Sequence, residues 1–314
     1  MLSTGRWHRT INVEEDPMNI RPTQFDGLQA LEITTSQVKL VAVTQVGPRI
    51  AFLGKPDGDN LLYWQRDDKG YGDWRLLGGH RTWVTRPEAD EAEDAYIPDN
   101  APCQVETSSS TVTLTGAPDP TFKIQRGIRI EAVDDRTFKV TGFVRNNGPM
   151  LYSAGVWSIT CSNPAGGKEY GIPLFDANGS WELCEIAIPR KWAGHTARVS
   201  DPQIELNEEF MIVRPQGVES KRALLAEPGI IALTWPEKRL SFIKRSPFNP
   251  QGSYPLGCNL SFYIGPSNFM VEMETMGEER TILPGETAEN TEVWKLVDEA
   301  FDWTKPQQLI DLVK

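Results

Sequence analysis

The sequence predicts an all-β protein made of large antiparallel sheets, with few and short helices. Apolar and polar residues alternate with a period of two in several segments, which is typical of half-buried strands. These segments are residues 37–44, 111–115, 124–131, 137–144 and 240–243. Turn signals rich in Gly, Pro, Asn and Asp separate such segments, at residues 56–58, 134–135, 146–149, 163–164, 177–179 and 284–285.

The sequence predicts one helix near the C-terminus and a single folded domain. Residues 306–313 are amphipathic, and Pro306 suits a first helical turn. No low-complexity linker divides the 314 residues. We expect residues 23–314 to form one β-sandwich domain. Residues 1–22 are charged and lack an apolar period, so we expect them to form a loose N-terminal arm.

The composition argues against several classes of protein. Asp and Glu number 43 against 32 Lys and Arg, which gives a net charge of −11. An acidic chain is a poor partner for nucleic acid or an anionic membrane surface. No apolar run approaches the roughly 20 residues of a membrane span, and no secretory signal is visible, so we expect a cytoplasmic protein. The 4 widely spaced cysteines indicate reduced thiols, and only 3 histidines argue against a metal centre.

The segment GGHRTWVTRPE at residues 78–88 combines side chains suited to binding and proton transfer. His80 titrates near neutral pH and can act as an acid or a base. Arg81 offers a planar fork of donors for hydroxyls or carboxylates. Trp83 offers an aromatic face, and Glu88 offers a carboxylate. The alternative interpretation is a surface loop with a hydrogen-bonded histidine.

Three other residues are candidates for binding a ligand. Arg49 stands in an apolar strand, where its charge must reach water or a partner. Trp157 follows a tight turn and is either a core filler or a stacking platform; the chain has 10 Trp in all. Lys244, together with Arg81, would suit a carboxylate or phosphate on a ligand, or both are ordinary surface cations.

Glu272 and Glu274 are candidates for acid–base chemistry. Their spacing of two places them on one face of a strand. Two neighbouring carboxylates repel each other, which raises the pKa of at least one where water is excluded. A general acid or base is often prepared in this way. The alternative is two exposed glutamates on the wet face of an edge strand.

Four collinear segments resemble the galactose mutarotase-like superfamily, and most closely its uncharacterised bacterial branch DUF4380. They are GPRI…NLLYW, GGHRTWVTRPE, VRNNGPMLYSAGVWSIT and VEMETMGEERTILPGETAENTEVWKL. The resemblance extends from Phe25 to Val297. It implies a β-supersandwich with a sugar-binding groove on a concave face.

The resemblance also implies the activity of an aldose 1-epimerase, or mutarotase. In that reaction a glutamate takes the proton of the anomeric hydroxyl and a histidine protonates the ring oxygen, so that the ring opens and recloses. The base would be Glu272 or Glu274. Residues 154–158, AGVWS, stand where the family has its histidine, which leaves His80 as the candidate acid. The reaction needs no metal or organic cofactor.

In this scheme the ligand is a sugar or sugar acid. Arg49 or Arg81 would hold its hydroxyls, and Trp83 and Trp157 would form a stacking platform. Two alternatives use the same residues. A non-catalytic carbohydrate-binding protein fits the missing family histidine and the abundant tryptophan. The other alternative is a glycan lyase or hydrolase. A hydrolase would need two carboxylates about 5–10 Å apart. Glu88 would supply one of them, and either Glu272 or Glu274 the other.

Overall fold

The computed structural model describes residues 18–66, 70–71, 74–85, 99–175, 184–188 and 198–313. Its strands form an 11-stranded sheet, a 10-stranded sheet and a small 2-stranded sheet, and all pairings are antiparallel. We call the 11-stranded sheet A and the 10-stranded sheet B. The prediction of an all-β sandwich of large antiparallel sheets is confirmed.

Sheet A contains the strands on which most candidate site residues lie. Its order is β1 (Asn19–Phe25), β2 (Leu28–Thr34), β3 (Lys39–Val43), β4 (Arg49–Gly54), β7 (His80–Thr85), β12 (Tyr152–Ser162), β21 (Val271–Met276), β20 (Leu260–Ile264), β17 (Ser220–Ala226) and β14 (Cys184–Ala187), with β22 (Arg280–Ile282) paired to β12. The strands β7, β12 and β21 therefore lie side by side in the middle of the sheet.

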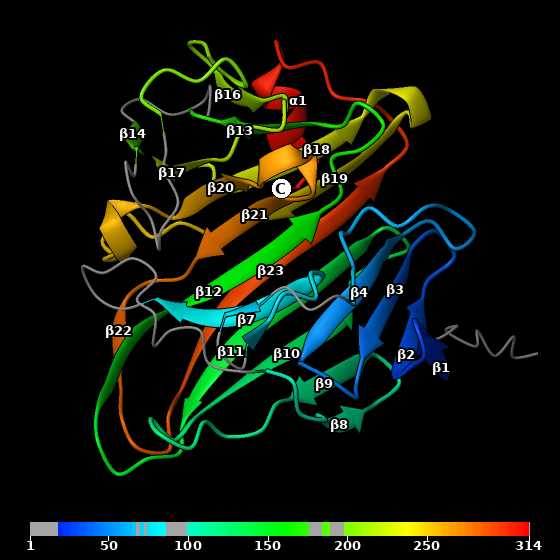
Figure 1. Ribbon diagram of the computed structural model, residues 1–314, viewed down its shortest axis with the longest axis vertical. Helices are drawn as coiled ribbons and strands as arrows, with labels where there is room; N and C mark the ends of the chain where they lie inside the picture. Colours follow the sequence, from blue (N-terminus) through cyan, green and yellow to red (C-terminus); the bar gives the residue numbers. More distant parts are fainter. Residues whose placement is uncertain are drawn as a thin grey trace, which may run out of the picture.

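Sheet B packs against one face of sheet A. Its order is β15 (Ile204–Leu206), β16 (Phe210–Val213), β13 (Glu169–Pro173), β18 (Ile230–Trp235), β19 (Leu240–Arg245), β23 (Thr287–Val297), β11 (Thr137–Asn146), β10 (Ile124–Ala132), β9 (Thr111–Thr115) and β8 (Gln104–Thr107). Figure 1 shows β7 and β12 crossing in front of β11 and β23. The small sheet pairs β5 (Gly70–Tyr71) with β6 (Trp74–Arg75).

The main hydrophobic core lies between the two sheets, because alternate residues of each strand point inward. On β11 the inward residues include Phe138, Val140 and Val144, all buried. On β21 they include Val271 and Met273. The segments predicted as strands from their alternation correspond to β3, β9, β10, β11 and β19.

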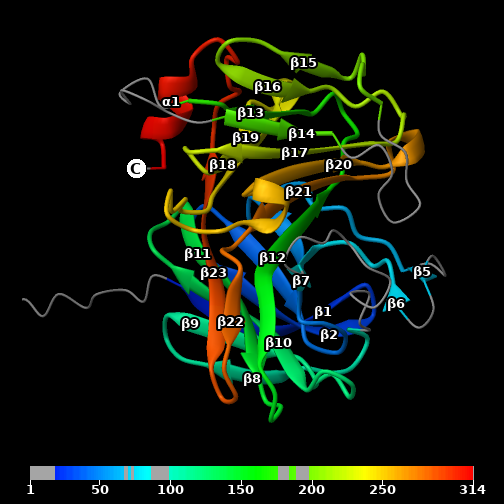
Figure 2. The same cartoon turned by 90° about the vertical axis from the view of Figure 1, so that its left-hand side faces the viewer.

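Helices are short, as predicted. The α-helix α1 (Pro306–Asp311) begins at Pro306 and buries Leu309 and Ile310. It packs near β13 and β16 on the outer side of sheet B (Figure 2). The described residues also include three short 3₁₀ helices, η2 (Pro236–Lys238), η3 (Pro255–Gly257) and η4 (Pro266–Asn268). Within the described residues, no helix is long and apolar enough to span a membrane.

The expected N-terminal arm is described only in part. Residues 1–17 lie outside the described residues. The predicted boundary at residue 22 falls inside β1, which pairs along its full length with β2 at the edge of sheet A.

Candidate functional site

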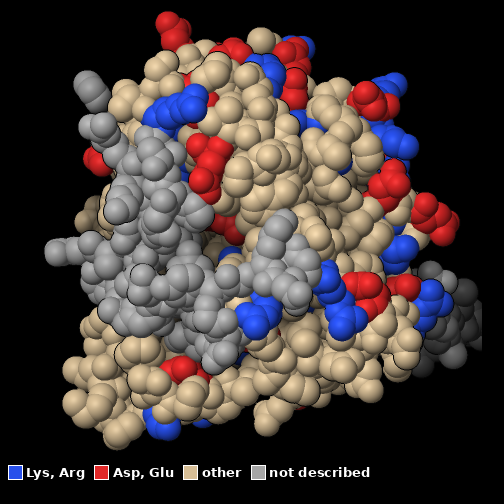
Figure 3. Space-filling model, in the orientation of Figure 1, with Lys and Arg blue, Asp and Glu red and all other residues tan. Residues whose placement is uncertain are grey.

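The face of sheet A turned away from sheet B, here called the outer face, carries a group of charged and aromatic side chains. The cross-strand pairs Trp83–Trp157, Cys161–Glu272 and Lys221–Tyr263 place neighbours on the same side of the sheet. The group consists of Arg81, Trp83, Trp157, Cys161, Lys221, Glu272 and Glu274. Figure 3 shows this side of the molecule hollowed near its middle, with acidic and basic side chains around the hollow.

Two ion pairs lie next to each other in this group. Lys221 Nζ lies 3.0 Å from Glu274 Oε1, and Trp157 Nε1 donates a hydrogen bond of 3.1 Å to Glu274 Oε2. Arg81 Nη2 lies 3.5 Å from Glu272 Oε1. All four charged residues are buried, with exposed fractions between 0% and 5%. The expected pairing of two glutamates on one face is therefore present. However, β21 is a central strand between β12 and β20, so the alternative of two exposed glutamates on an edge strand is wrong.

Cys161 belongs to the same group. Its Sγ donates a hydrogen bond of 3.6 Å to Glu272 Oε1. Burial, followed by the nearby Glu272 carboxylate, raises the pKa of the Cys161 thiol. The residue is therefore a neutral hydrogen-bond donor at neutral pH.

The two tryptophans contact cations and have no exposed stacking face. Trp83 and Trp157 meet edge to face with centroids 5.9 Å apart. The guanidinium of Arg81 lies 4.2 Å from the centroid of Trp83, and Lys221 Nζ lies 5.0 Å from that of Trp157. Such cation–π contacts stabilise a buried cation, by about 2 kcal/mol or more where water is excluded. Trp83 is 0% exposed and Trp157 is 1% exposed, so the predicted sugar platform is not open in this structure.

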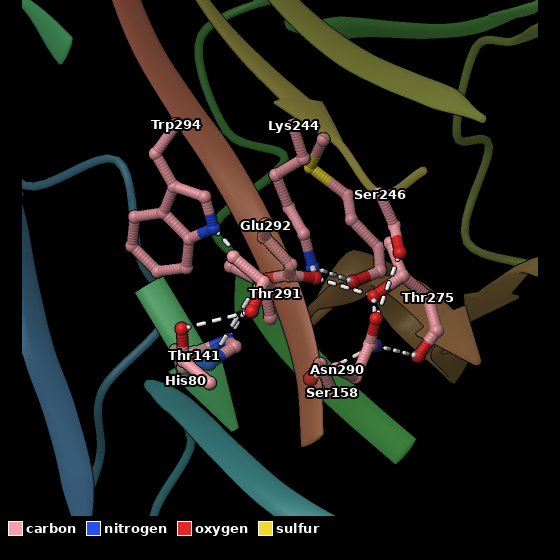
Figure 4. A network of polar contacts seen from close by, with 12 residues as sticks. His80, Thr141, Ser158, Lys244, Ser246, Thr275, Asn290, Thr291, Glu292 and Trp294 are labelled. Atoms are coloured by element: carbon pink, nitrogen blue, oxygen red, sulfur yellow. Dashed lines mark hydrogen bonds and ion pairs between the residues drawn. The ribbon is translucent and has the colours of Figure 1, made fainter. Parts of the chain in front are cut away.

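His80 and Lys244 lie between the sheets, on the other side of sheet A from Glu272 and Glu274. His80 Nδ1 lies 2.9 Å from Thr160 Oγ1 and its ring meets Trp294 edge to face. Lys244 Nζ lies 2.9 Å from Glu292 Oε1 (Figure 4). The expectation that His80 faces a glutamate of β21 across a sugar is therefore corrected. Lys244 likewise does not reach the outer face. For His80 the reason is strand parity, because neighbouring residues of β7 point to opposite faces. Lys244 stands on β19 of sheet B and reaches β12 and β21 from the inner side.

The electrostatics of His80 also argue against a role as the acid. Burial, with the nearby charges of Lys244 and Arg81, lowers the pKa of His80 well below its usual 6.5. At neutral pH the imidazole is therefore neutral and lacks the second N–H proton that an imidazolium acid would donate.

Arg49 holds the chain near the start of β7. Its Nη2 lies 2.6 Å from Asp99 Oδ1, and its Nη1 donates to the carbonyl oxygen of Gly78 at 2.9 Å. Burial acts to raise the pKa of Asp99, but Arg49 and Arg126 outweigh it, and the pKa is lowered. A Cβ at Gly79 would lie 2.4 Å from the Ile50 carbonyl oxygen at a φ of +72°, so glycine is required there. The contacts of Arg49 therefore place the segment that precedes His80.

Lys221, Asp99 and Glu292 were not among the residues predicted from the sequence. Lys221 stands in β17, whose sequence SKRALLA also contains Arg222, so the signal that identified Arg49, one charge in an apolar strand, is absent there. Glu88 was predicted to bind the ligand and lies outside the described residues. No group of three or more His, Cys, Asp or Glu side chains in the described part of the chain could hold a metal ion.

The chain was compared with known families, curated proteins and solved structures. No family model matches it. No curated protein matches it. A putative aldose 1-epimerase from Klebsiella pneumoniae matches 94% of this chain and 87% of its own length, with a TM-score of 0.60 and 9% identity. A galactose mutarotase-like protein from Clostridium acetobutylicum matches 91% of this chain and 100% of its own, with a TM-score of 0.56 and 11% identity.

A larger protein contains the same fold. A TPR-domain containing protein from Parabacteroides distasonis matches 88% of this chain with a TM-score of 0.57 and 12% identity. This chain spans only 48% of that protein's length. Likeness at such identities defines the fold class: the chain has a galactose mutarotase-like β-sandwich fold. Function has to be argued from the site.

Proposed function

We propose that the protein binds a sugar or sugar acid over the outer face of sheet A and equilibrates its anomers, as an aldose 1-epimerase does. The observation that carries this proposal is the buried pair of Glu274 and Lys221. Removing two charges from water costs free energy that an apolar pair would not cost. Glu274 stands on the central strand β21, beside the second ion pair of Arg81 and Glu272, and this position supports a chemical role for the pair.

The proposed reaction moves two protons. Glu274 accepts the proton of the anomeric hydroxyl, and the Lys221 ammonium gives a proton to the ring oxygen. The bond between the anomeric carbon and the ring oxygen breaks, which leaves an open-chain aldehyde. After rotation of the aldehyde the ring closes on its other face, and both protons return. Lys221 thus takes the role that the sequence suggested for His80, and Arg81 beside Glu272 supplies donors for hydroxyls.

A non-catalytic carbohydrate-binding protein is the second candidate. The position of His80 favours it, because this histidine is turned away from the outer face. A glycan hydrolase would use Glu88 as its second carboxylate, and Glu88 lies outside the described residues. The sequence alone supports two finer parts of the proposal, the DUF4380 branch and a cytoplasmic location.

Anomer equilibration followed by proton NMR tests the proposal. Purified protein is added to freshly dissolved α-anomers of glucose, galactose and glucuronate. We expect acceleration by the wild type and a loss of about 100-fold or more in Glu274→Gln and Lys221→Met. The control is Glu278→Gln, which removes an exposed carboxylate just beyond β21.

The other outcomes separate the candidates. Saturation-transfer contacts to a sugar without any acceleration would favour the binding protein. The absence of both effects would overturn the proposal for these sugars.

A further inference from the structure

A buried polar network lies between the sheets, directly behind the candidate site. Most of the surrounding core is apolar. The network includes His80, Ser158, Thr160, Lys244, Ser246, Thr275, Asn290, Glu292 and Trp294 (Figure 4). Its members come from β7, β12 and β21 of sheet A, from β19 and β23 of sheet B, and from the residue after β19.

Lys244 connects the two sheets. Its Nζ lies 2.9 Å from Glu292 Oε1 in the neighbouring strand of sheet B. It donates to Thr160 Oγ1 at 2.8 Å and to the carbonyl oxygen of Met273 at 2.9 Å, both in sheet A. An ammonium group has three donors, and here each one has a partner.

Glu292 is held as firmly as Lys244. Its Oε1 accepts from Lys244 and from Thr275 Oγ1, and its Oε2 accepts from Trp294 Nε1 at 2.7 Å. Lys244 and Glu292 are both 0% exposed. The side-chain polar atoms of Lys244 and Glu292 therefore all have partners, whereas the nearby His80 Nε2 has no hydrogen bond. Buried polar groups that are satisfied in this way make the strands that they join rigid.

The atoms held by this network alternate along the chain with the residues of the outer face. Met273, whose carbonyl Lys244 binds, stands between Glu272 and Glu274. Thr275, which bonds to Glu292, follows Glu274. Because successive side chains of a strand point to opposite faces, a strand fixed from behind presents its front side chains at fixed positions.

We infer that Lys244 and Glu292 are positioning residues, which hold β21 and β12 from behind so that Glu274 meets Lys221 and Trp157 on the outer face. The inference rests on the proposed function for its chemical consequence. Reacting groups need to be held within about 0.5 Å of the productive geometry. Neither Lys244 nor Glu292 touches the ligand.

The Trp157 indole provides a readout that does not depend on catalysis. Its Nε1–H donates to Glu274, so the position of its NMR signal reports where this carboxylate lies. Lys244→Met is the test variant. The control is Ile130→Ala, which removes buried apolar volume from β10 in the same core and costs a similar free energy of unfolding, about 2–5 kcal/mol. The indole signal is assigned by its absence from Trp157→Phe.

We expect the Trp157 indole signal to shift in Lys244→Met and to stay in place in Ile130→Ala. In the anomer assay kcat should fall about 10–100-fold in Lys244→Met, since small misplacements of reacting groups have effects of that size. KM should change little. An unshifted indole signal in Lys244→Met would overturn the inference, whether or not the wild type is catalytic.

The two proposals fail in distinguishable ways. A wild type without epimerase activity, together with a shifted indole signal in Lys244→Met, would overturn the proposed function and support the positioning role. If Lys244→Met does not fold, Glu292→Gln replaces it, because the amide keeps the shape of the side chain and removes its charge. The same shift is expected there, and its absence would overturn the inference.

Discussion

His80 and Arg81 are consecutive residues of β7, and their side chains lie on opposite faces of sheet A. Arg81 Nη2 lies 3.5 Å from Glu272 Oε1 on the outer face. The His80 ring packs edge to face on Trp294 of sheet B, with centroids 4.7 Å apart. The segment GGHRTWVTRPE thus contributes to two separate places, the candidate site and the network behind it.

The first prediction concerns the role of His80 in catalysis. In His80→Asn the amide keeps a hydrogen bond to Thr160, and the imidazole does not reach the outer face. We therefore expect the rate of anomer equilibration to stay within about tenfold of the wild type, well short of the 10²–10⁴-fold typical of a lost general acid. Proton NMR measures this rate. A complete loss of activity in a folded His80→Asn protein would contradict the assignment of the acid role to Lys221.

The second prediction concerns stability against pH. The pKa of His80 is lowered in the folded protein, first by burial and then by Lys244 and Arg81. The unfolded chain therefore binds a proton below about pH 6.5 that the folded protein does not bind. Above that pH the neutral His80 does not lower the free energy of unfolding. As the pH falls from about 6.5 towards the pKa of His80 in the folded protein, the free energy of unfolding decreases. The decrease is at most about 1.4 kcal/mol per pH unit.

Urea unfolding at pH 7.5, 6.5 and 5.5 checks this prediction. Between pH 6.5 and 5.5 the free energy of unfolding should decrease more steeply in the wild type than in His80→Asn. The variant is the control because it keeps the carboxylates of the wild type, such as Asp99. Equal slopes for the two proteins would show that His80 is not held neutral.

The third prediction concerns the buried pair of Lys221 and Glu274. Lys221→Met leaves the Glu274 carboxylate buried without its cation, and we expect a loss of about 3–5 kcal/mol in the free energy of unfolding. The double variant Lys221→Met/Glu274→Leu should be more stable than Lys221→Met, because it no longer contains the buried carboxylate that lost its cation. Denaturant unfolding of Lys221→Met, Glu274→Leu and the double variant gives the coupling free energy between the two residues. Additive losses would mean that the pair does not interact in solution.

The fourth prediction concerns the close approach of the sheets at Gly142. A Cβ there would lie 2.7 Å from Thr82 Oγ1 and 3.0 Å from Ser158 Oγ. Gly142→Ala should therefore destabilise the protein by about 1–3 kcal/mol. Gly142→Ala/Thr82→Ala removes the Thr82 atoms that clash but keeps the contact with Ser158 Oγ, so it should recover part of this loss, as thermal unfolding can measure. If the double variant is no more stable than Gly142→Ala, the loss of stability does not come from the contact with Thr82.

The strands were predictable because their signals are local. Alternation along residues 124–131 and 137–144 follows from the pleat of each strand, and the structure forms β10 and β11 there. The same rule placed Glu272 and Glu274 on one face of a strand. It gave no means of knowing that this strand is central and that both carboxylates are buried, because the order of strands depends on pairings between distant segments.

The partners of the charged residues could not be predicted, because they come together from far apart in the chain. Lys221 and Glu274 are 53 residues apart, and Arg49 and Asp99 are 50 apart. Lys221 is followed by Arg222 and Glu274 follows Glu272 in the same strand, so no local motif shows which charge pairs with which distant partner. This is why Lys221 was missed and why Lys244 was interpreted as a cation that binds the ligand.

The sequence by itself determined the all-β class, the positions of several strands and which side chains share a face. The tertiary structure decided which face of sheet A packs against sheet B, and so sent His80 and Lys244 inward and Arg81, Glu272 and Glu274 outward. The physical reason is that a period of two sorts side chains into two sets, and only packing against a second layer decides which set is enclosed.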